Sequence, residues 1–303
     1  MKRCFMMCLW LALISPLSAQ IVVTDLVSVA DTFVRSVDPT HNYGGAGALA
    51  VSGLIATNVL GQQEGLLDSV MQFDTSGAIS NFNSTIGVGR WVIASVTLNL
   101  FEQGPPNNTI FNRGVGPFEV LWVGTNSWLE GTGNPNAPTM DGIVWSNRSS
   151  VVNSNMYESL GLFTNGGTDG LVRISLGMPA GFVGSLPSGT NVNFYLTTTT
   201  NSPVGFTFHS HNFVDSTQWP FLEITAVPTA QITALTVSNS NASIAFATAN
   251  GLTNFVEYTT NLVGESWITL TNVTGTGGSV VVTDPGAAAQ PKRFYRVRLT
   301  VSP

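Results

Sequence analysis

Alternating apolar and polar positions recur along most of the chain and predict β-strands. In residues 95–100, Val96, Leu98 and Leu100 share one face of an extended segment, and the intervening polar residues occupy the other. Almost no helical spacing interrupts this pattern, so it predicts two antiparallel sheets packed face to face. The same period of two recurs at 118–123, 171–176, 192–197, 204–208 and 221–225.

The first residues have the layout of a secretory signal peptide. Lys2 and Arg3 precede an apolar run that is too short to span a membrane, and the small pair Ser18 and Ala19 follows. We expect residues 1–19 to be removed, which makes the protein secreted, extracellular or bound to the cell surface; an uncleaved anchor is the alternative. Both cysteines lie in this segment. The mature chain is therefore expected to have no disulfide and no membrane span.

A domain boundary is expected near residues 226–230, where a strand pattern ends in a proline and a new series of shorter strands begins. Residues 20–227 then form one β-sandwich. Residues 228–303 hold about six short strands, which predicts a second, smaller sandwich of immunoglobulin or fibronectin size.

Acidic residues outnumber basic ones in the larger domain. Residues 21–229 hold five basic and fourteen acidic residues, a net charge of −9, and no lysine. A nucleic-acid-binding surface needs clustered Lys or Arg to neutralise phosphates, so nucleic acid is excluded as a partner of this region. The same acidity favours neutral glycans over anionic ones.

Short blocks of sequence occur in order at residues 30–34, 42–44, 70–74, 94–98, 128–132, 142–147, 208–210 and 220–225. Together they resemble the DNRLRE-type secreted module. The resemblance implies a jelly-roll β-sandwich, allied to carbohydrate-binding modules of bacterial polysaccharide-degrading enzymes and also found in cell-surface and adhesive proteins. Where that family usually carries a Ser-Lys/Arg-Glu block, this chain has Ser210, His211 and Asn212. After residue 228, the segments 256–262, 266–267 and 293–298 are similar to a small β-module that ends many secreted bacterial proteins.

Aromatic residues beside turns are candidates for carbohydrate binding. Such modules stack sugar rings on exposed aromatic side chains and bond the hydroxyls to planar polar groups. Tyr43, Trp128 and Trp145 lie beside Gly- or Asn-rich turns, and Arg148 follows closely. We expect these four residues to contribute to a sugar site. The alternative is that the two tryptophans pack at the edge of the core and anchor a long loop.

Acidic residues near the strand ends suggest a hard-cation site. Asp31 and Glu223, on the opening and closing strands of the larger domain, are the candidate ligands of a structural Ca²⁺. The alternative is that Asp31 caps a turn and Glu223 faces water. His209 and His211 stand two apart, the spacing of a zinc or copper site on one face of a strand. No third ligand is evident, so ordinary surface residues are the simpler interpretation.

Enzymatic chemistry has little support in the chain. Glu130 and Asp141 flank a loop with two tryptophans, and glycoside hydrolysis requires paired carboxylates. There is no Gly-x-Ser-x-Gly elbow and no dinucleotide fingerprint, so we expect a protein that is not an enzyme. Two functions stay open: a secreted protein that binds a polysaccharide or a cell-surface glycan, and a structural or adhesive surface protein without a small-molecule ligand.

Overall fold

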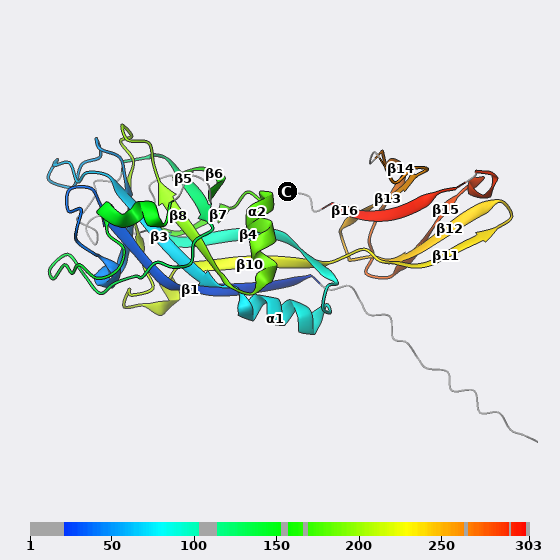
Figure 1. Cartoon of the computed structure of the whole chain (residues 1–303), viewed down its shortest axis with the longest axis horizontal. Coiled ribbons are helices and arrows are strands. Elements are labelled where there is room, and N and C mark those ends of the chain that lie inside the picture. Colours follow the sequence, from blue (N-terminus) through cyan, green and yellow to red (C-terminus); the bar gives the residue numbers. More distant parts are fainter. Residues whose placement is uncertain are drawn as a thin grey trace, which may run out of the picture. The chain divides into compact units, whose positions relative to one another are not determined.

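The computed structural model describes residues 21–102, 114–152, 157–165, 169–263, 266–290 and 292–300. They form two compact units, Val22–Ala226 and the part of the chain from Val227 onward (Figure 1). Both units consist mainly of β-strands, which confirms the all-β prediction. The expected signal peptide, residues 1–19, lies outside the described residues. Among the helices that are described, none has the length and apolar character needed to cross a membrane.

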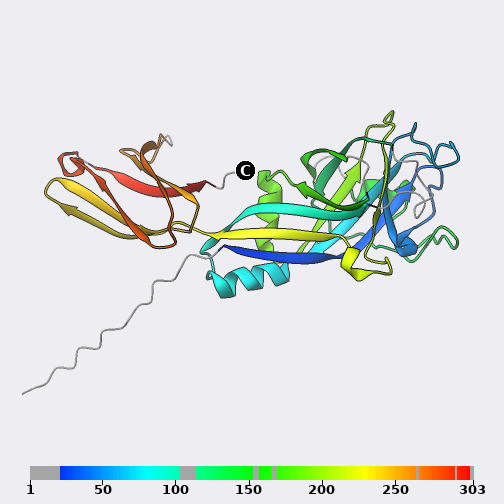
Figure 2. The same cartoon turned by 180° about the vertical axis from the view of Figure 1, so that it is seen from behind.

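The first unit is built on one extended set of antiparallel strand pairings. The strands follow the order β1-β10-β4-β9-β2-β3-β8-β5-β6, β7 pairs with β4, and β1 also pairs with β3. Figure 2 shows β1, β10 and β4 side by side. The strands are β1 (Val22–Arg35), β2 (Ala48–Ser52), β3 (Leu67–Asp74), β4 (Trp91–Glu102), β5 (Gly116–Val123), β6 (Tyr157–Asn165), β7 (Gly170–Ser175), β8 (Asn191–Thr197), β9 (Gly205–His209) and β10 (Phe221–Pro228).

Strand β1 changes partner along its length. Val22–Val27 pair with β10, and the residues from Ser28 onward pair with β3. The register shifts between Ser28 and Ala30, at the point where the partner changes. Such an irregularity bends a strand and turns the following side chains to a new direction. Asp31 lies directly after it.

Two α-helices interrupt the strands of the first unit, although the alternating pattern predicts almost none. In α1, Ala78 and Phe82 stand four apart and are fully buried. Ile79 also packs against the core, but small polar residues fill most of the remaining positions. The apolar stripe of the helix is therefore short and narrow. The helices are α1 (Ser76–Thr85) and α2 (Ala180–Ser185), and the 3₁₀ turns of both units are η1 (Gly44–Ala46), η2 (Trp145–Ser150), η3 (Leu186–Ser188), η4 (Ser216–Gln218) and η5 (Ala287–Ala289).

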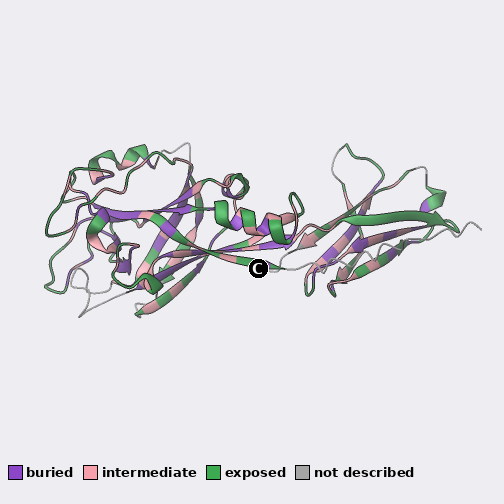
Figure 3. Cartoon of the chain, turned by 90° about the horizontal axis from the view of Figure 1, so that it is seen from below, coloured by how far each residue is buried: buried purple, intermediate pink, exposed green. Residues whose placement is uncertain are grey.

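The strands β3 and β8 are covered on both faces. Met71 and Phe194 point into the main core, which is rich in phenylalanine. Val70 and Tyr195, one position away on each strand, face a second apolar cluster that includes Ile143. Buried residues therefore recur without alternation in β3, where seven of eight residues are buried. Figure 3 shows how buried and exposed positions are distributed over the chain. The second cluster exists because the segment after β5 packs over this face of the sheet.

The second unit contains two three-stranded sheets, β11-β12-β15 and β14-β13-β16. Its core is formed by Ile244, Phe246, Val256 and Val282. All seven residues of β11 are exposed. The strands are β11 (Ile232–Ser238), β12 (Asn241–Ala247), β13 (Thr253–Thr259), β14 (Ile268–Thr274), β15 (Ser279–Asp284) and β16 (Phe294–Thr300).

We expect Phe246→Ala to destabilise the second unit by about 3–5 kcal/mol, because removing a fully buried ring leaves a cavity. The first unit has its own core and should keep its unfolding transition. Differential scanning calorimetry would show one transition shifted and the other retained. Phe294→Ala, at a ring that is 37% exposed, serves as the matched control and should have a small effect. Loss of both transitions together in Phe246→Ala would contradict the separation of the two cores.

Candidate functional site

The buried amide of Asn42 organises the long segment between β5 and η2. Its Nδ2 donates hydrogen bonds to the carbonyl oxygens of Glu130, at 2.6 Å, and Ile143, at 2.8 Å. Its Oδ1 accepts from the backbone N–H groups of Gly44, at 2.9 Å, and Gly133, at 3.1 Å. The full hydrogen-bonding capacity of the amide is therefore used, and one side chain connects residues that are about a hundred positions apart.

Glycines allow this close packing around Asn42. Gly131 has a φ of +83°, and a Cβ atom at this position would lie 2.2 Å from Asn42 Oδ1. A Cβ atom on Gly44 would lie 2.4 Å from the carbonyl oxygen of Gly131. The two segments approach so closely that a side chain at either position would displace backbone.

A pocket of about 200 Å³ opens beside Trp128. The indole is partly exposed, and its Nε1 donates a 2.8 Å hydrogen bond to Oδ1 of Asn193. The ring is therefore held in one orientation, with part of its surface facing the pocket. The lining residues combine apolar and polar side chains: Ser127, Trp128, Leu129, Gly142, Ile143, Asn147 and Ser150.

Trp145 and Arg148 contact each other rather than the pocket. The guanidinium carbon of Arg148 lies 3.6 Å from the centre of the Trp145 ring and covers one of its faces. Arg148 also lies 3.8 Å from the carboxylate of Asp68. Burial raises the pKa of Asp68, and hydrogen bonds from Tyr195 and Thr197 together with the charge of Arg148 oppose this. The pair therefore holds η2 against the sheet, which is the anchoring alternative expected for Trp145.

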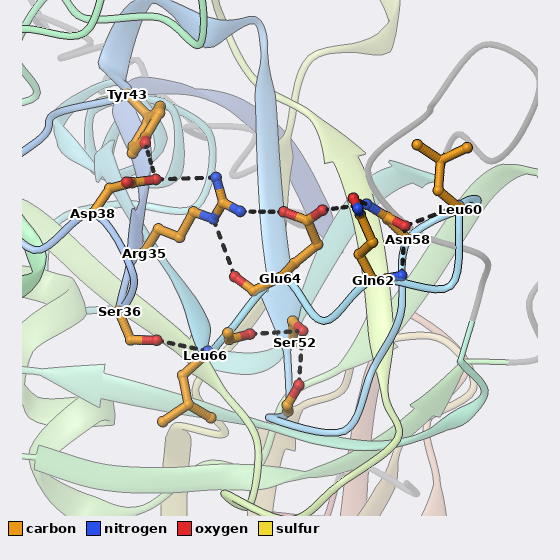
Figure 4. Close-up of polar contacts among 12 residues, drawn as sticks. Arg35, Ser36, Asp38, Tyr43, Ser52, Asn58, Leu60, Gln62, Glu64 and Leu66 are labelled. Carbon is orange, nitrogen blue, oxygen red and sulfur yellow. Dashed lines mark hydrogen bonds and ion pairs between the residues drawn. The ribbon is translucent and has the colours of Figure 1, made fainter.

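Tyr43 does not present its ring at the surface. It is only 5% exposed, and its ring stacks on Phe33 with the centroids 4.5 Å apart. Its hydroxyl donates to Asp38, which also pairs with Arg35 (Figure 4). Burial, followed by the hydrogen bond to Asp38, raises the pKa of Tyr43 to about 12. Contrary to the expectation from its neighbouring turn, this ring is a packing residue and offers little area on which a sugar could stack.

Figure 4 also shows how the segment around Tyr43 is fixed. Arg35 forms ion pairs with both Asp38 and Glu64. Glu64 in turn accepts a 2.7 Å hydrogen bond from the amide of Asn58. These contacts hold the turn after β1 and the segment before β3 together.

The two expected calcium ligands lie far apart. Glu223 pairs across the β1–β10 ladder with Asp25, six residues before Asp31 on β1. At about 3.3 Å per residue, this separates Glu223 from Asp31 by about 20 Å along the strand. Glu223 lies instead 3.9 Å from Arg173. The two carboxylates therefore do not form one site, and the expectation that Asp31 and Glu223 together bind Ca²⁺ is wrong.

Asp31 instead meets Glu130 and His211. The Nδ1 atom of His211 lies 3.3 Å from Oδ1 of Asp31 and 3.2 Å from Oε1 of Glu130. One oxygen or nitrogen from each of the three residues falls within 4.8 Å of the other two. The sequence singled out each residue, but for three different chemistries, because nothing in their spacing shows that the fold brings them together.

The pKa values of Glu130 and His211 are both raised at this cluster. Burial raises the pKa of Glu130 to about 7, against the nearby charge of His211 and a hydrogen bond from the backbone of Asp31. The interaction with Asp31 raises the pKa of His211, which burial opposes. Both shifts have the same origin: a fully buried carboxylate, Asp31, and a mostly buried one, Glu130, favour a positive charge between them.

His209 and His211 do not act as a pair on one strand face. Strand β9 ends at His209, so the alternation that would align the two side chains stops before His211. The His209 ring stacks on Phe213 with the centroids 3.6 Å apart. The His211 ring lies edge-on to Trp219 at 5.9 Å.

Asp141 has a local role in the loop. Its carboxylate accepts hydrogen bonds from the backbone and hydroxyl of Thr132 and from the hydroxyl of Thr139. These bonds, that of Thr139 first, lower the pKa of Asp141. The carboxylate of Asp141 therefore stabilises this turn.

No family model matches this chain, and a comparison with curated proteins finds no match for it. The resemblance to DNRLRE-type modules stays a prediction.

We expect Asn42→Ala to lower the free energy of unfolding of the first unit by about 3 kcal/mol, because it leaves buried carbonyl and N–H groups without partners. Amide hydrogens in residues 129–143 should exchange faster in this variant, as measured by mass spectrometry. Asn134→Ala is the control, since Asn134 bonds only to backbone two and three residues away in the same turn. Equal exchange in both variants would show that Asn42 does not organise the loop.

Proposed function

We propose that this protein is a secreted, non-catalytic carbohydrate-binding protein that holds a polysaccharide chain at the Trp128 pocket. The observation that carries the proposal is the partly exposed indole beside a pocket of about 200 Å³. Ser127, Asn147 and Ser150 add hydroxyl and amide groups to the same lining. A sugar ring has an apolar face and a rim of hydroxyls, so an aromatic wall with polar neighbours is complementary to it.

The pocket is held in shape before any ligand arrives. Asn193 fixes the indole of Trp128, and Asn42 fixes the backbone at Glu130 and at Ile143, which lines the pocket. A preorganised site loses less conformational freedom on binding, so more of its contact energy is retained as affinity. Trp145 and Arg148 support the site indirectly, by holding the turn that carries Asn147 and Ser150.

The remaining sequence features agree with this function. The antiparallel strand order of the first unit supports a jelly-roll sandwich of the DNRLRE type, and the two small sheets after Val227 support an immunoglobulin-like module. The signal-peptide pattern of residues 1–19 supports an extracellular or cell-surface location. The net charge of −9 over residues 21–229 supports a neutral rather than an anionic glycan.

A structural or adhesive role is the second candidate, and strand β11 favours it. Leu235 and Val237 pair across from Ile244 and Ala242, and so lie on the core side of their sheet. They are nevertheless 51% and 64% exposed. Apolar side chains on an edge strand favour association with other chains.

We expect Trp128→Ala to weaken binding to a neutral polysaccharide at least tenfold in affinity electrophoresis on a panel of neutral and acidic polymers. Trp267→Ala is the matched control: it removes another half-buried indole, one covered by Arg296 at 4.2 Å in the second unit, and should leave binding unchanged.

Binding to acidic polymers alone would overturn the preference for neutral glycans. Absence of binding to every polymer, together with concentration-dependent self-association in sedimentation, would favour the structural role.

A further inference from the structure

The Asp31–Glu130–His211 cluster brings together three segments that are distant in sequence. Asp31 comes from β1, Glu130 from the segment after β5, and His211 from the turn after β9. The Asp31 side chain is fully buried, and the other two are about one-fifth exposed. Two carboxylates and an imidazole converging in this way need a positive charge between them.

Two atoms at the centre of the cluster have unused hydrogen-bonding capacity. Oδ1 of Asp31 and Nδ1 of His211 are both buried, and neither has a hydrogen-bond partner, although they lie 3.3 Å apart. Buried polar atoms are nearly always paired, so this arrangement calls for a group that both atoms can contact at once. A metal ion accepts lone pairs from both.

The distances fit a metal coordination shell. Zinc binds nitrogen and oxygen ligands at about 2.0–2.2 Å in a tetrahedral arrangement, which places neighbouring ligand atoms about 3.3–3.5 Å from each other. The separations from His211 Nδ1 to the oxygens of Asp31 and Glu130 are 3.3 and 3.2 Å. We propose that Asp31, Glu130 and His211 bind a divalent transition-metal ion of the zinc class, with solvent completing the shell.

Neighbouring groups orient the two carboxylates for this role. Oδ2 of Asp31 accepts hydrogen bonds from the hydroxyl of Ser28, at 2.8 Å, and from the backbone of His211, at 2.9 Å, which leaves Oδ1 directed to the centre. Oε1 of Glu130 accepts from the backbone N–H of Asp31 at 3.2 Å and from the amide of Asn212 at 2.9 Å. Hydrogen bonds of this kind, made to the residues that bind a metal, fix the geometry of metal sites.

The ligand types separate this site from a calcium site. Calcium takes six to eight oxygen ligands, whereas imidazole nitrogen with carboxylate oxygen suits zinc and its transition-metal neighbours. The ion would fasten β1 to the turn after β9 and to Glu130, two residues beyond Trp128. Its role is structural, and the proposal does not depend on carbohydrate binding.

The test uses residues 20–303 without a histidine tag, stripped of metal with chelator. Isothermal titration with Zn²⁺ should show one strong site, with a Kd in the micromolar range or below, and Zn²⁺ should raise Tm by several degrees, as Ca²⁺ should not. Co²⁺ should give the visible absorption of a low-symmetry site with an imidazole ligand. Glu130→Gln and His211→Ala should each weaken Zn²⁺ binding at least thirtyfold, while His41→Ala, a histidine outside the cluster, should not.

Circular dichroism establishes that each variant is folded, and the near-isosteric Glu130→Gln keeps the test valid if His211→Ala unfolds. Failure of folded protein to bind Zn²⁺, Co²⁺ or Mn²⁺ at millimolar concentration would overturn the proposal. Zinc binding that is unchanged in both ligand variants, or a preference for Ca²⁺, would do so as well.

Discussion

A single buried amide, that of Asn42, holds together the segments on which both sites depend. The segment from Glu130 to Ile143 has little regular secondary structure, so its backbone groups need partners that strands would otherwise supply. Asn42 supplies two N–H donors and one oxygen that accepts two hydrogen bonds, at the point where this segment meets the chain before β2. The positions of Trp128 and Glu130 follow from this contact, because the carbonyl oxygen of Glu130 accepts one of these hydrogen bonds and Trp128 lies two residues before it.

The change of partner along β1 also affects more than one part of the structure. A regular strand of this length would keep its side chains in strict alternation from end to end. The shift between Ser28 and Ala30 lets the strand leave β10 and join β3. It also places Ser28 within hydrogen-bonding distance of Asp31, three residues later. One local irregularity thus joins two parts of the sheet and orients a buried carboxylate.

The strands were predictable because a half-buried strand shows a period of two, as in the segment with Val96, Leu98 and Leu100. Helix α1 was not predictable, because Ala78, Ile79 and Phe82 are the only large or core-facing apolar residues among its ten positions and most of the others are small and polar. The candidate site residues were harder to predict than the strands and helices. Tyr43 stands beside a glycine-rich turn, and only the fold reveals that Phe33 covers it. The approach of Glu130 and His211 to Asp31 depends on contacts between residues separated by about a hundred or more positions, which local spacing does not encode.

The pairing of β1 with β10 joins the first and last strands of the first unit. Val22 lies opposite Ala226, so the strand that leads the unit finds its first partner in the strand that completes it. Contacts this distant in sequence form slowly, because a long loop must be closed before they contribute. Until synthesis passes residue 226, the first half of β1 lacks that partner. The first unit can therefore reach its complete set of strand pairings only after residue 226 has been synthesised.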